Sequence, residues 1–176
     1  MHVLVATAGA LSPGPVVEFT RHLIGGTGSV TVVTVVEVPR SFLKEIGSDD
    51  WHPLHEGTDG EQSVATVSEY LAERGERLTE PIRLALETAR IPCDVQVLEG
   101  SDPALAISEA ADGLGADVVL LGATKQIFDR EAWESVSARV MLEAGRPVLV
   151  VPETRRATEE VDEIDGLQEA ASSTAI

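Results

Sequence analysis

The run Val30-Thr31-Val32-Val33-Thr34-Val35-Val36 consists only of β-branched residues. Branching at Cβ restricts a side chain in a helix and suits the pleated surface of a sheet, so the run predicts a strand. Shorter apolar runs occur at Val3–Thr7, Asp117–Leu121 and Val148–Val151. Runs that are apolar on both faces are typical of strands that lie buried inside a parallel sheet.

Helical patterns alternate with these strands. Apolar residues recur at helical spacing in four segments, which are Val16–Leu23, Ser63–Arg90, Ala104–Leu114 and Trp133–Ala144. A further alternating segment, Cys93–Leu98, predicts one more strand. This order predicts an α/β fold: one doubly wound domain with a five-stranded parallel sheet and helices on both faces.

Proline and glycine mark the expected ends of these elements. Asp102-Pro103 is a favourable helix start, with an N-cap acid before a proline at the first helical position. Pro81 lies inside the long helical pattern and removes a backbone donor, which predicts a kink or a break. The glycines of Gly25–Gly28 precede a strand, whereas a dinucleotide-binding loop follows one, so we expect only a turn there.

The regular pattern ends near residue 152, and we expect one domain over residues 1–152. The tail at 153–176 contains an acidic run, Glu159 to Asp165, and ends in small and polar residues. This composition predicts disorder, with an interaction arm as the alternative. The polar segment at 41–62 fits neither period, and its order is left open.

The charge balance restricts the possible partners. Thirty acidic residues against 13 basic ones give a formal net charge of −17. A surface of this sign repels phosphate backbones and anionic headgroups, which argues against nucleic acid and membrane surfaces as partners. Lysine occurs only at Lys44 and Lys125. Arginine in place of lysine fits a salt-loving host or a GC-rich genome equally well.

The sequence also lacks the marks of a membrane or disulfide-bonded protein. No stretch approaches the roughly 18 continuous apolar residues of a membrane span. The N-terminal apolar run is too short for a signal peptide. Cys93 is the only cysteine and cannot form an internal disulfide. We therefore expect a cytoplasmic protein without membrane insertion.

Three C-terminal segments resemble the universal stress protein family. They are Gly100-Ser101-Asp102-Pro103 through Gly122, then Glu134-Ser135-Val136-Ser137-Ala138-Arg139-Val140, then Arg146-Pro147-Val148-Leu149-Val150-Val151-Pro152. The order of elements fits this family over residues 1–152, and the middle of the chain resembles it least. The resemblance implies an adenine nucleotide alpha hydrolase-like fold.

In the nucleotide-binding branch of this family, the fourth strand ends in Gly-x-x-Gly, followed after nine residues by Gly-Ser or Gly-Thr. Such glycines let backbone amides approach the phosphates. Here Gly122 is kept, Lys125 and Glu134 replace the other two glycines, and eight residues separate them. Ala8 replaces the aspartate that the family tends to place after the first strand.

The resemblance therefore implies an altered nucleotide site. Its expected residues are Thr7, Ala8, Val35, Gly122, Lys125, Glu134, Ser135 and Val136. A carboxylate at 134 repels phosphate, whereas an ammonium at 125 attracts it, and the two can instead pair and close the pocket. We expect ATP binding to be weak or lost.

Three functional hypotheses remain. The first is a stress-response protein that acts through a regulatory partner as a homodimer, with Val148–Val151 as the dimer strand that the resemblance implies. The second is a sensor that binds AMP, a cyclic nucleotide or another adenine compound in preference to ATP. The third is an accessory subunit of a transporter or kinase, contacted through the acidic tail.

Other groupings of reactive residues give no catalytic prediction. His52, His55 and Glu56 lie beside Asp49 and Asp50, but His-x-x-His alone is a poor metal signature, and we expect solvated histidines and no metal. Cys93 at a strand start is expected to be buried and inert. An N-cap role is sufficient to explain Ser135. No acid–base pair is recognisable, so we expect no enzyme.

Overall fold

A computed structural model describes residues 1–38, 59–123 and 135–151, with side chains of the long helix described from residue 66 on. The elements follow the expected alternation of strand and helix. They are β1 (His2–Ala6), α1 (Pro13–Ile24), β2 (Ser29–Val36), α3 (Asp59–Thr88), β3 (Asp94–Glu99), α4 (Pro103–Gly113), β4 (Val118–Gly122), α5 (Val136–Glu143) and β5 (Val148–Val151).

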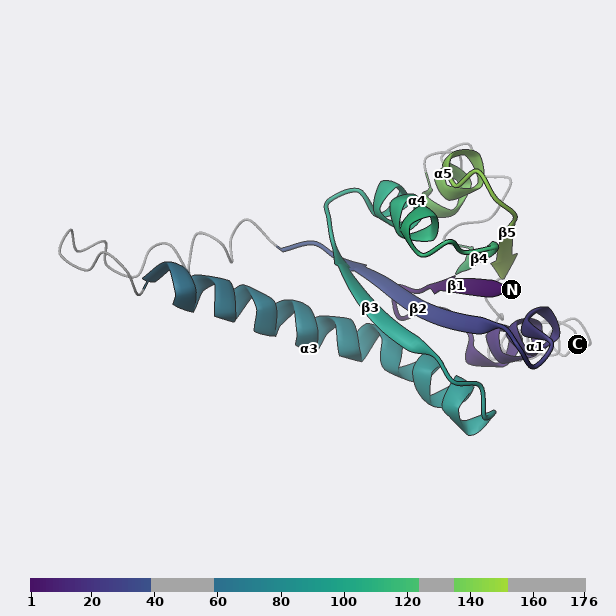
Figure 1. Ribbon diagram of the computed structural model, residues 1–176. Helices are drawn as coiled ribbons and strands as arrows, with labels where there is room; N and C mark the ends of the chain where they lie inside the picture. Colours follow the sequence, from purple (N-terminus) through teal and green to yellow (C-terminus); the bar gives the residue numbers. More distant parts are fainter. Residues whose placement is uncertain (39–58, 124–134, 152–176) are drawn as a thin grey trace, which may run out of the picture.

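The five strands form one parallel sheet in the order β3-β2-β1-β4-β5. Figure 1 shows α1 and α3 on one face of this sheet and α4 and α5 on the other. The doubly wound α/β fold expected from the sequence is therefore confirmed. The chain direction across the sheet reverses between β1 and β4, which makes this pair the topological switch point.

Successive side chains of each strand point to opposite faces of the sheet, so the protein has two separate cores. Val3, Val5 and Leu120 point to the face that carries α1 and α3, where they pack with Ile82 and Leu86 of α3. The intervening residues of the strands point to the other face, where they pack with buried residues of α4 and α5 such as Ile107 and Val140. The interior strands β1, β2 and β4 are thus largely buried on both faces because helices cover both, whereas the edge strand β3 is mostly exposed and carries polar side chains.

The glycine-rich segment Gly25–Gly28 forms the expected turn. Gly25 and Gly26 have φ angles of 54° and 87° and end α1 in the left-handed region. A Cβ at Gly28 would lie 2.3 Å from the carbonyl oxygen of Met1, so only glycine fits at the start of β2.

The structure shows that one of the two outcomes expected at Pro81, a break in the long helix, is wrong. Pro81 does not break it, because α3 runs continuously from Asp59 to Thr88. Pro81 itself is exposed, so water can reach the carbonyl that its missing N–H leaves without a helical partner. Ile82 and Leu86 next to it are buried in the core, and this packing holds the helix together through the proline.

A buried glycine sets the distance between α3 and β3. A Cβ at Gly75 would lie 2.2 Å from Cγ2 of Val97 and 2.9 Å from its Cγ1. Alanine normally stabilises a helix interior by about 1 kcal/mol relative to glycine. At Gly75 the overlap with a β-branched side chain opposes that gain, because Val97 has few rotamers that clear the new methyl group.

We therefore expect Gly75→Ala to lower the free energy of unfolding, by about 1–3 kcal/mol. Urea denaturation measures the change, and adding Val97→Ala to the variant should recover part of the loss by making room for the methyl group. A Gly75→Ala protein more stable than the wild type would show that α3 and β3 do not pack this closely.

The Cys93 prediction is only partly right. Cys93 precedes β3 and is half-buried rather than buried, because β3 is an edge strand. Burial and the nearby Glu87 carboxylate raise the pKa of its thiol. The raised pKa keeps the thiol protonated at neutral pH and lowers its reactivity.

Several predicted features lie outside the described residues. They are the acidic tail, the histidine segment at 49–56 and the positions Lys125, Trp133 and Glu134. Among the described residues, no group of three or more histidine, cysteine or acidic side chains is arranged to hold a metal ion. No helix in the same part of the chain is long and apolar enough to cross a membrane.

Candidate functional site

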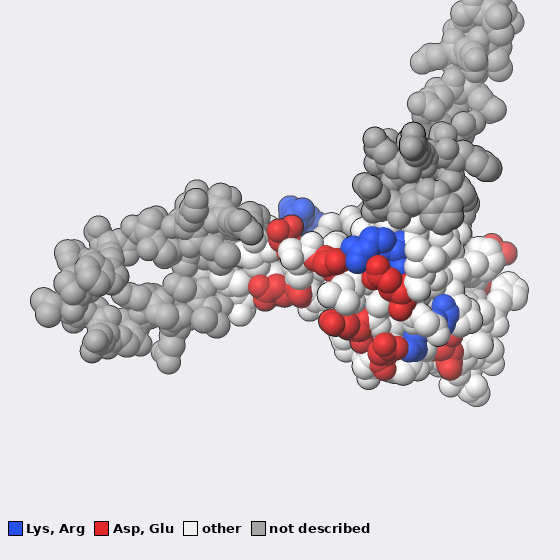
Figure 2. All heavy atoms as spheres, turned by 90° about the horizontal axis from the view of Figure 1, so that it is seen from above, with Lys and Arg blue, Asp and Glu red and all other residues white. Residues whose placement is uncertain are grey.

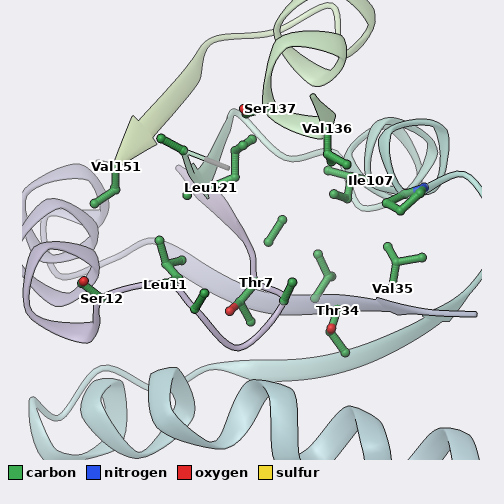
Figure 3. A pocket seen from close by; sticks show the side chains of 17 residues that line it. Thr7, Leu11, Ser12, Thr34, Val35, Ile107, Leu121, Val136, Ser137 and Val151 are labelled. Carbon is green, nitrogen blue, oxygen red and sulfur yellow. The ribbon is translucent and has the colours of Figure 1, made fainter. Parts of the chain in front are cut away.

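A pocket of about 180 Å³ opens at the carboxyl ends of β1, β2 and β4. It lies at the switch point between β1 and β4, where doubly wound sheets place their ligands. Figure 3 shows its side chains converging from the sheet, from the loop after β1 and from α4 and α5. The lining residues are Ala6, Thr7, Ala8, Ala10, Leu11, Ser12, Val33, Thr34, Val35, Pro103, Ile107, Leu121, Gly122, Ala123, Val136, Ser137 and Val151.

The lining is almost entirely apolar. Its polar side chains are the hydroxyls of Thr7, Ser12, Thr34 and Ser137, and none of the described lining residues is ionisable. A concave apolar surface with a few hydroxyls at its border is typical of a site for a flat organic ligand. The described part of the lining has hydroxyls but no histidine, cysteine, acidic or basic side chain that could act as an acid or base beside them.

The loop after β1 is fixed by hydrogen bonds at its start. The amide of Thr7 donates to the carbonyl of Val33 at 2.9 Å, which extends the pairing of β1 with β2. The Thr7 hydroxyl accepts a hydrogen bond from the Gly9 amide at 3.0 Å. Gly9 has a φ of 87°, and a Cβ there would lie 3.0 Å from Leu78 of α3. The loop therefore turns sharply against α3 and leaves Ala8 exposed at the border of the pocket.

Three helices begin beside the pocket. Helix α1 starts at Pro13 after the lining residue Ser12, and the lining residues Pro103 and Val136 are the first residues of α4 and α5. The amides at helix N-termini carry partial positive charge and favour anions. The pocket thus combines an apolar floor with a border that is compatible with a negatively charged group.

The first turns of α4 and α5 are joined by charged side chains. Asp102 caps α4 by accepting hydrogen bonds from the amides of Ala104 and Leu105, each at 3.2 Å. The same carboxylate oxygen accepts a hydrogen bond from Nη1 of Arg139 on α5 at 2.8 Å. These contacts, with that to Arg139 the largest, lower the pKa of Asp102 below its usual value.

This lowered pKa gives a pH prediction for Asp102→Asn. Asparagine caps a helix about as well as aspartate, so the variant removes mainly the charge. Because the pKa is lower in the folded state, the charge stabilises the fold above the unfolded pKa of about 4, and this contribution is lost as the pH falls through the folded pKa. Wild type and variant should therefore differ in unfolding free energy at pH 7 and converge toward pH 3 in urea titrations. An equal difference at both pH values would contradict this role.

Among the charged side chains on the face that carries α4 and α5, acidic ones predominate. Figure 2 shows acidic side chains spread over the face seen from above, with acidic groups next to the fewer basic ones. Arg83 pairs with Glu87 on α3 at 2.7 Å, and Arg146 pairs with Asp112. On the face shown in Figure 2, the basic side chains thus lie among acidic ones and form no separate basic patch.

The structure brings most of the expected site residues together. Thr7, Ala8, Val35, Gly122 and Val136 all line the pocket. Ser135 lies beside the lining and caps α5, where its hydroxyl accepts a hydrogen bond from the Ala138 amide at 3.3 Å. The two replaced glycine positions, Lys125 and Glu134, are outside the described residues.

Sequence reasoning missed other lining residues, notably Leu11, Ser12, Pro103, Ile107 and Ser137. Ser137 is buried in the first turn of α5, with its hydroxyl 3.1 Å from that of Ser135. Two sequence patterns could have indicated some of these residues. Ser12-Pro13 and Asp102-Pro103 mark helix starts that follow predicted strands, and the loops between such strands and helices are where ligands bind in this type of sheet. Ile107 had no such signal, because a residue on an apolar helical stripe looks the same whether it fills a core or borders a cavity.

Fold and pocket together define a small doubly wound α/β protein with an apolar pocket at the switch point. The sequence profile of the universal stress protein family matches residues 1–152. This chain belongs to the universal stress protein family, and the resemblance seen in its C-terminal segments is confirmed. No curated protein matches the sequence.

Solved structures of this family share the fold at low sequence identity. A universal stress protein in complex with cAMP is 17% identical, with a TM-score of 0.59 over 88% of this chain and 98% of the other. One from Arabidopsis thaliana with AMP bound is 15% identical, with a TM-score of 0.52 over 90% and 94%. One from Burkholderia pseudomallei is 16% identical, with a TM-score of 0.53 over 86% and 95%.

Proposed function

We propose that this chain is a non-enzymatic, regulatory universal stress protein that binds a small adenine compound in the switch-point pocket and holds ATP only weakly. The observation that carries this proposal is the pocket itself. It is an apolar cavity bordered by three helix N-termini and a few hydroxyls. A purine ring fits the apolar part, and one phosphate at the border would meet the N-termini of α1 and α5, because the amides of Ala104 and Leu105 on α4 already donate to Asp102.

Two similar structures support an adenine ligand, since one holds cAMP and the other AMP. The walls of the pocket in this chain favour the same class. Val35 and Ile107 present apolar side chains, and Thr7 and Ser137 contribute hydroxyls to its lining. AMP and cAMP each carry one phosphate, and the described part of the lining offers backbone dipoles at the helix starts, but no side-chain cation, to hold it.

Weak ATP binding follows from the residues that replace the expected ones. Ala8 has no side-chain group to bind the ligand where the family tends to have an aspartate. Lys125 and Glu134 stand where glycines would let backbone amides approach a triphosphate chain. A carboxylate at 134 repels an additional phosphate by roughly 1 to 4 kcal/mol at short range.

We also propose a homodimer through β5. This strand is at the end of the sheet, and Val148, Leu149 and Val150 are half-buried there. Met141 and Leu142 on the neighbouring helix α5 are 51% and 74% exposed, which adds apolar surface. An apolar edge strand with open backbone groups favours association, and a second copy of the same strand covers it symmetrically.

The altered site is tested by restoring the family residues. We expect the Lys125→Gly, Glu134→Gly pair to leave ATP affinity low, and the addition of Ala8→Asp to raise it, because the pair restores space and the aspartate restores a polar contact. Isothermal titration calorimetry with ATP and magnesium measures each affinity. Tight ATP binding by the pair alone would refute the role of Ala8, and tight binding by the wild type would refute the proposed preference.

A further inference from the structure

The wall of the pocket opposite the β1 loop is made by the first turns of two helices. Pro103 and Ile107 come from α4, and Val136 and Ser137 come from α5. Figure 3 shows Ile107 and Val136 next to each other across the junction of these helices. The width of the cavity therefore depends on how far apart the two helices lie.

Arg139 crosses this junction. Its Nη1 donates to Asp102 at 2.8 Å, while Nε and Nη2 donate to the two carboxylate oxygens of Glu143 at 3.0 and 3.2 Å. The two bonds to Glu143 fix the guanidinium plane on α5, because a bidentate pair defines an orientation as well as a distance. The guanidinium is thus held ready for the carboxylate on the other helix.

The position of this arginine is locally unfavourable. Arg139 lies in the first full turn of α5, where its amide donates to the Ser135 carbonyl, and cations are disfavoured near a helix N-terminus. Asp102 is the N-cap of α4, so the contact holds the start of one helix to the start of the other. The two carboxylates offset the unfavourable placement of the cation.

We propose that the Asp102–Arg139 ion pair is a positioning contact that sets the separation of α4 and α5, and thereby the affinity of the pocket for its ligand. This inference rests on the proposed function for its ligand. Arg139 does not line the pocket, so it acts through Val136 and Ser137 and not by touching the ligand. A contact that sets the shape of the cavity affects neutral and charged ligands alike.

The test compares adenosine, which is uncharged, with AMP. Calorimetry on Arg139→Gln should show both ligands bound about three- to tenfold more weakly, by the same factor for each. Arg139→Lys, which keeps a cation for Asp102, should recover part of the affinity. Arg83→Gln is the matched control, because it removes an arginine–glutamate pair on α3 away from the pocket, and it should bind both ligands as the wild type does.

Three results would overturn the proposal. They are unchanged affinities in Arg139→Gln, a loss for AMP without a loss for adenosine, and an equal loss in Arg83→Gln. Hydrogen exchange of the ligand-free proteins separates this inference from the proposed function. If the wild type binds neither ligand, the proposed function fails. The positioning role of the Asp102–Arg139 contact can still be tested in that case. It predicts faster hydrogen exchange at the first turns of α4 and α5 in Arg139→Gln than in the wild type, with exchange in β1 unchanged. Equal exchange in the two proteins would refute this role.

Discussion

Replacing Leu120 with alanine should lower the free energy of unfolding by about 2–5 kcal/mol. Leu120 is in the middle of β4, has no exposed surface and packs in the core that joins the sheet to α1 and α3. Its neighbours in the sheet are Val5 of β1 and Leu149 of β5. Strands cannot close in to fill the space left by the side chain, because their backbone hydrogen bonds fix the spacing, so the cavity term is added to the lost burial.

Leu105→Ala is the matched control for this measurement. The same side chain is removed from α4, where it is 48% exposed, and the expected change is within about 0.5 kcal/mol. Urea or thermal denaturation monitored by circular dichroism gives both values. A Leu120→Ala protein as stable as Leu105→Ala would mean that β4 is not an interior strand of the sheet.

Replacing Val150 with aspartate should convert the proposed dimer into monomers. Pairing of β5 with a second copy would bury the new carboxylate without a partner. Because the dimer is symmetric, two such carboxylates would be buried, one from each protomer. An unpaired buried charge costs about 3–5 kcal/mol, which corresponds to a dissociation constant raised more than about a hundredfold. In the monomer Val150 is half-exposed, so the variant should still fold.

Sedimentation or light scattering decides this point, with the chain mass of 18.6 kDa for a monomer and twice that for a dimer. Val95→Asp is the control, because Val95 is 37% exposed on β3, the strand at the opposite end of the sheet. The control should remain a dimer. A dimeric Val150→Asp protein, or a monomeric wild type, would contradict the β5 interface.

Most of the fold could be predicted from the sequence because apolar residues recur at different spacings in its strands and in its helices. The β-branched run at Val30–Val36 became β2, one residue longer at its start, where Ser29 pairs with His2. Strand ends are set by pairing with neighbours as well as by residue type, so such shifts are expected. The continuity of α3 through Pro81 depends on contacts of Ile82 and Leu86 with the sheet, which a local pattern does not contain.

The lining of the candidate pocket could be predicted where the family motif reaches it, but not where the wall comes from packing. Val35, Gly122 and Val136 follow from the resemblance, whereas Ile107 borders the cavity only because α4 folds back over β2. The roles of the two serines depend on helix geometry. Ser135 uses its hydroxyl as the cap of α5, and Ser137 lies along the pocket wall.

We propose that the pocket binds a small adenine compound in preference to ATP. The most direct test of this preference is the thermal unfolding of the wild-type protein with ATP, ADP, AMP, cyclic AMP or no ligand, in the presence of magnesium. A ligand at a hundred times its dissociation constant stabilises by about 2.7 kcal/mol, or several degrees in a domain of this size. We expect such a shift with AMP or cyclic AMP and a smaller one with ATP at equal concentration. A shift that is largest with ATP, or no shift with any of the four, would contradict this preference.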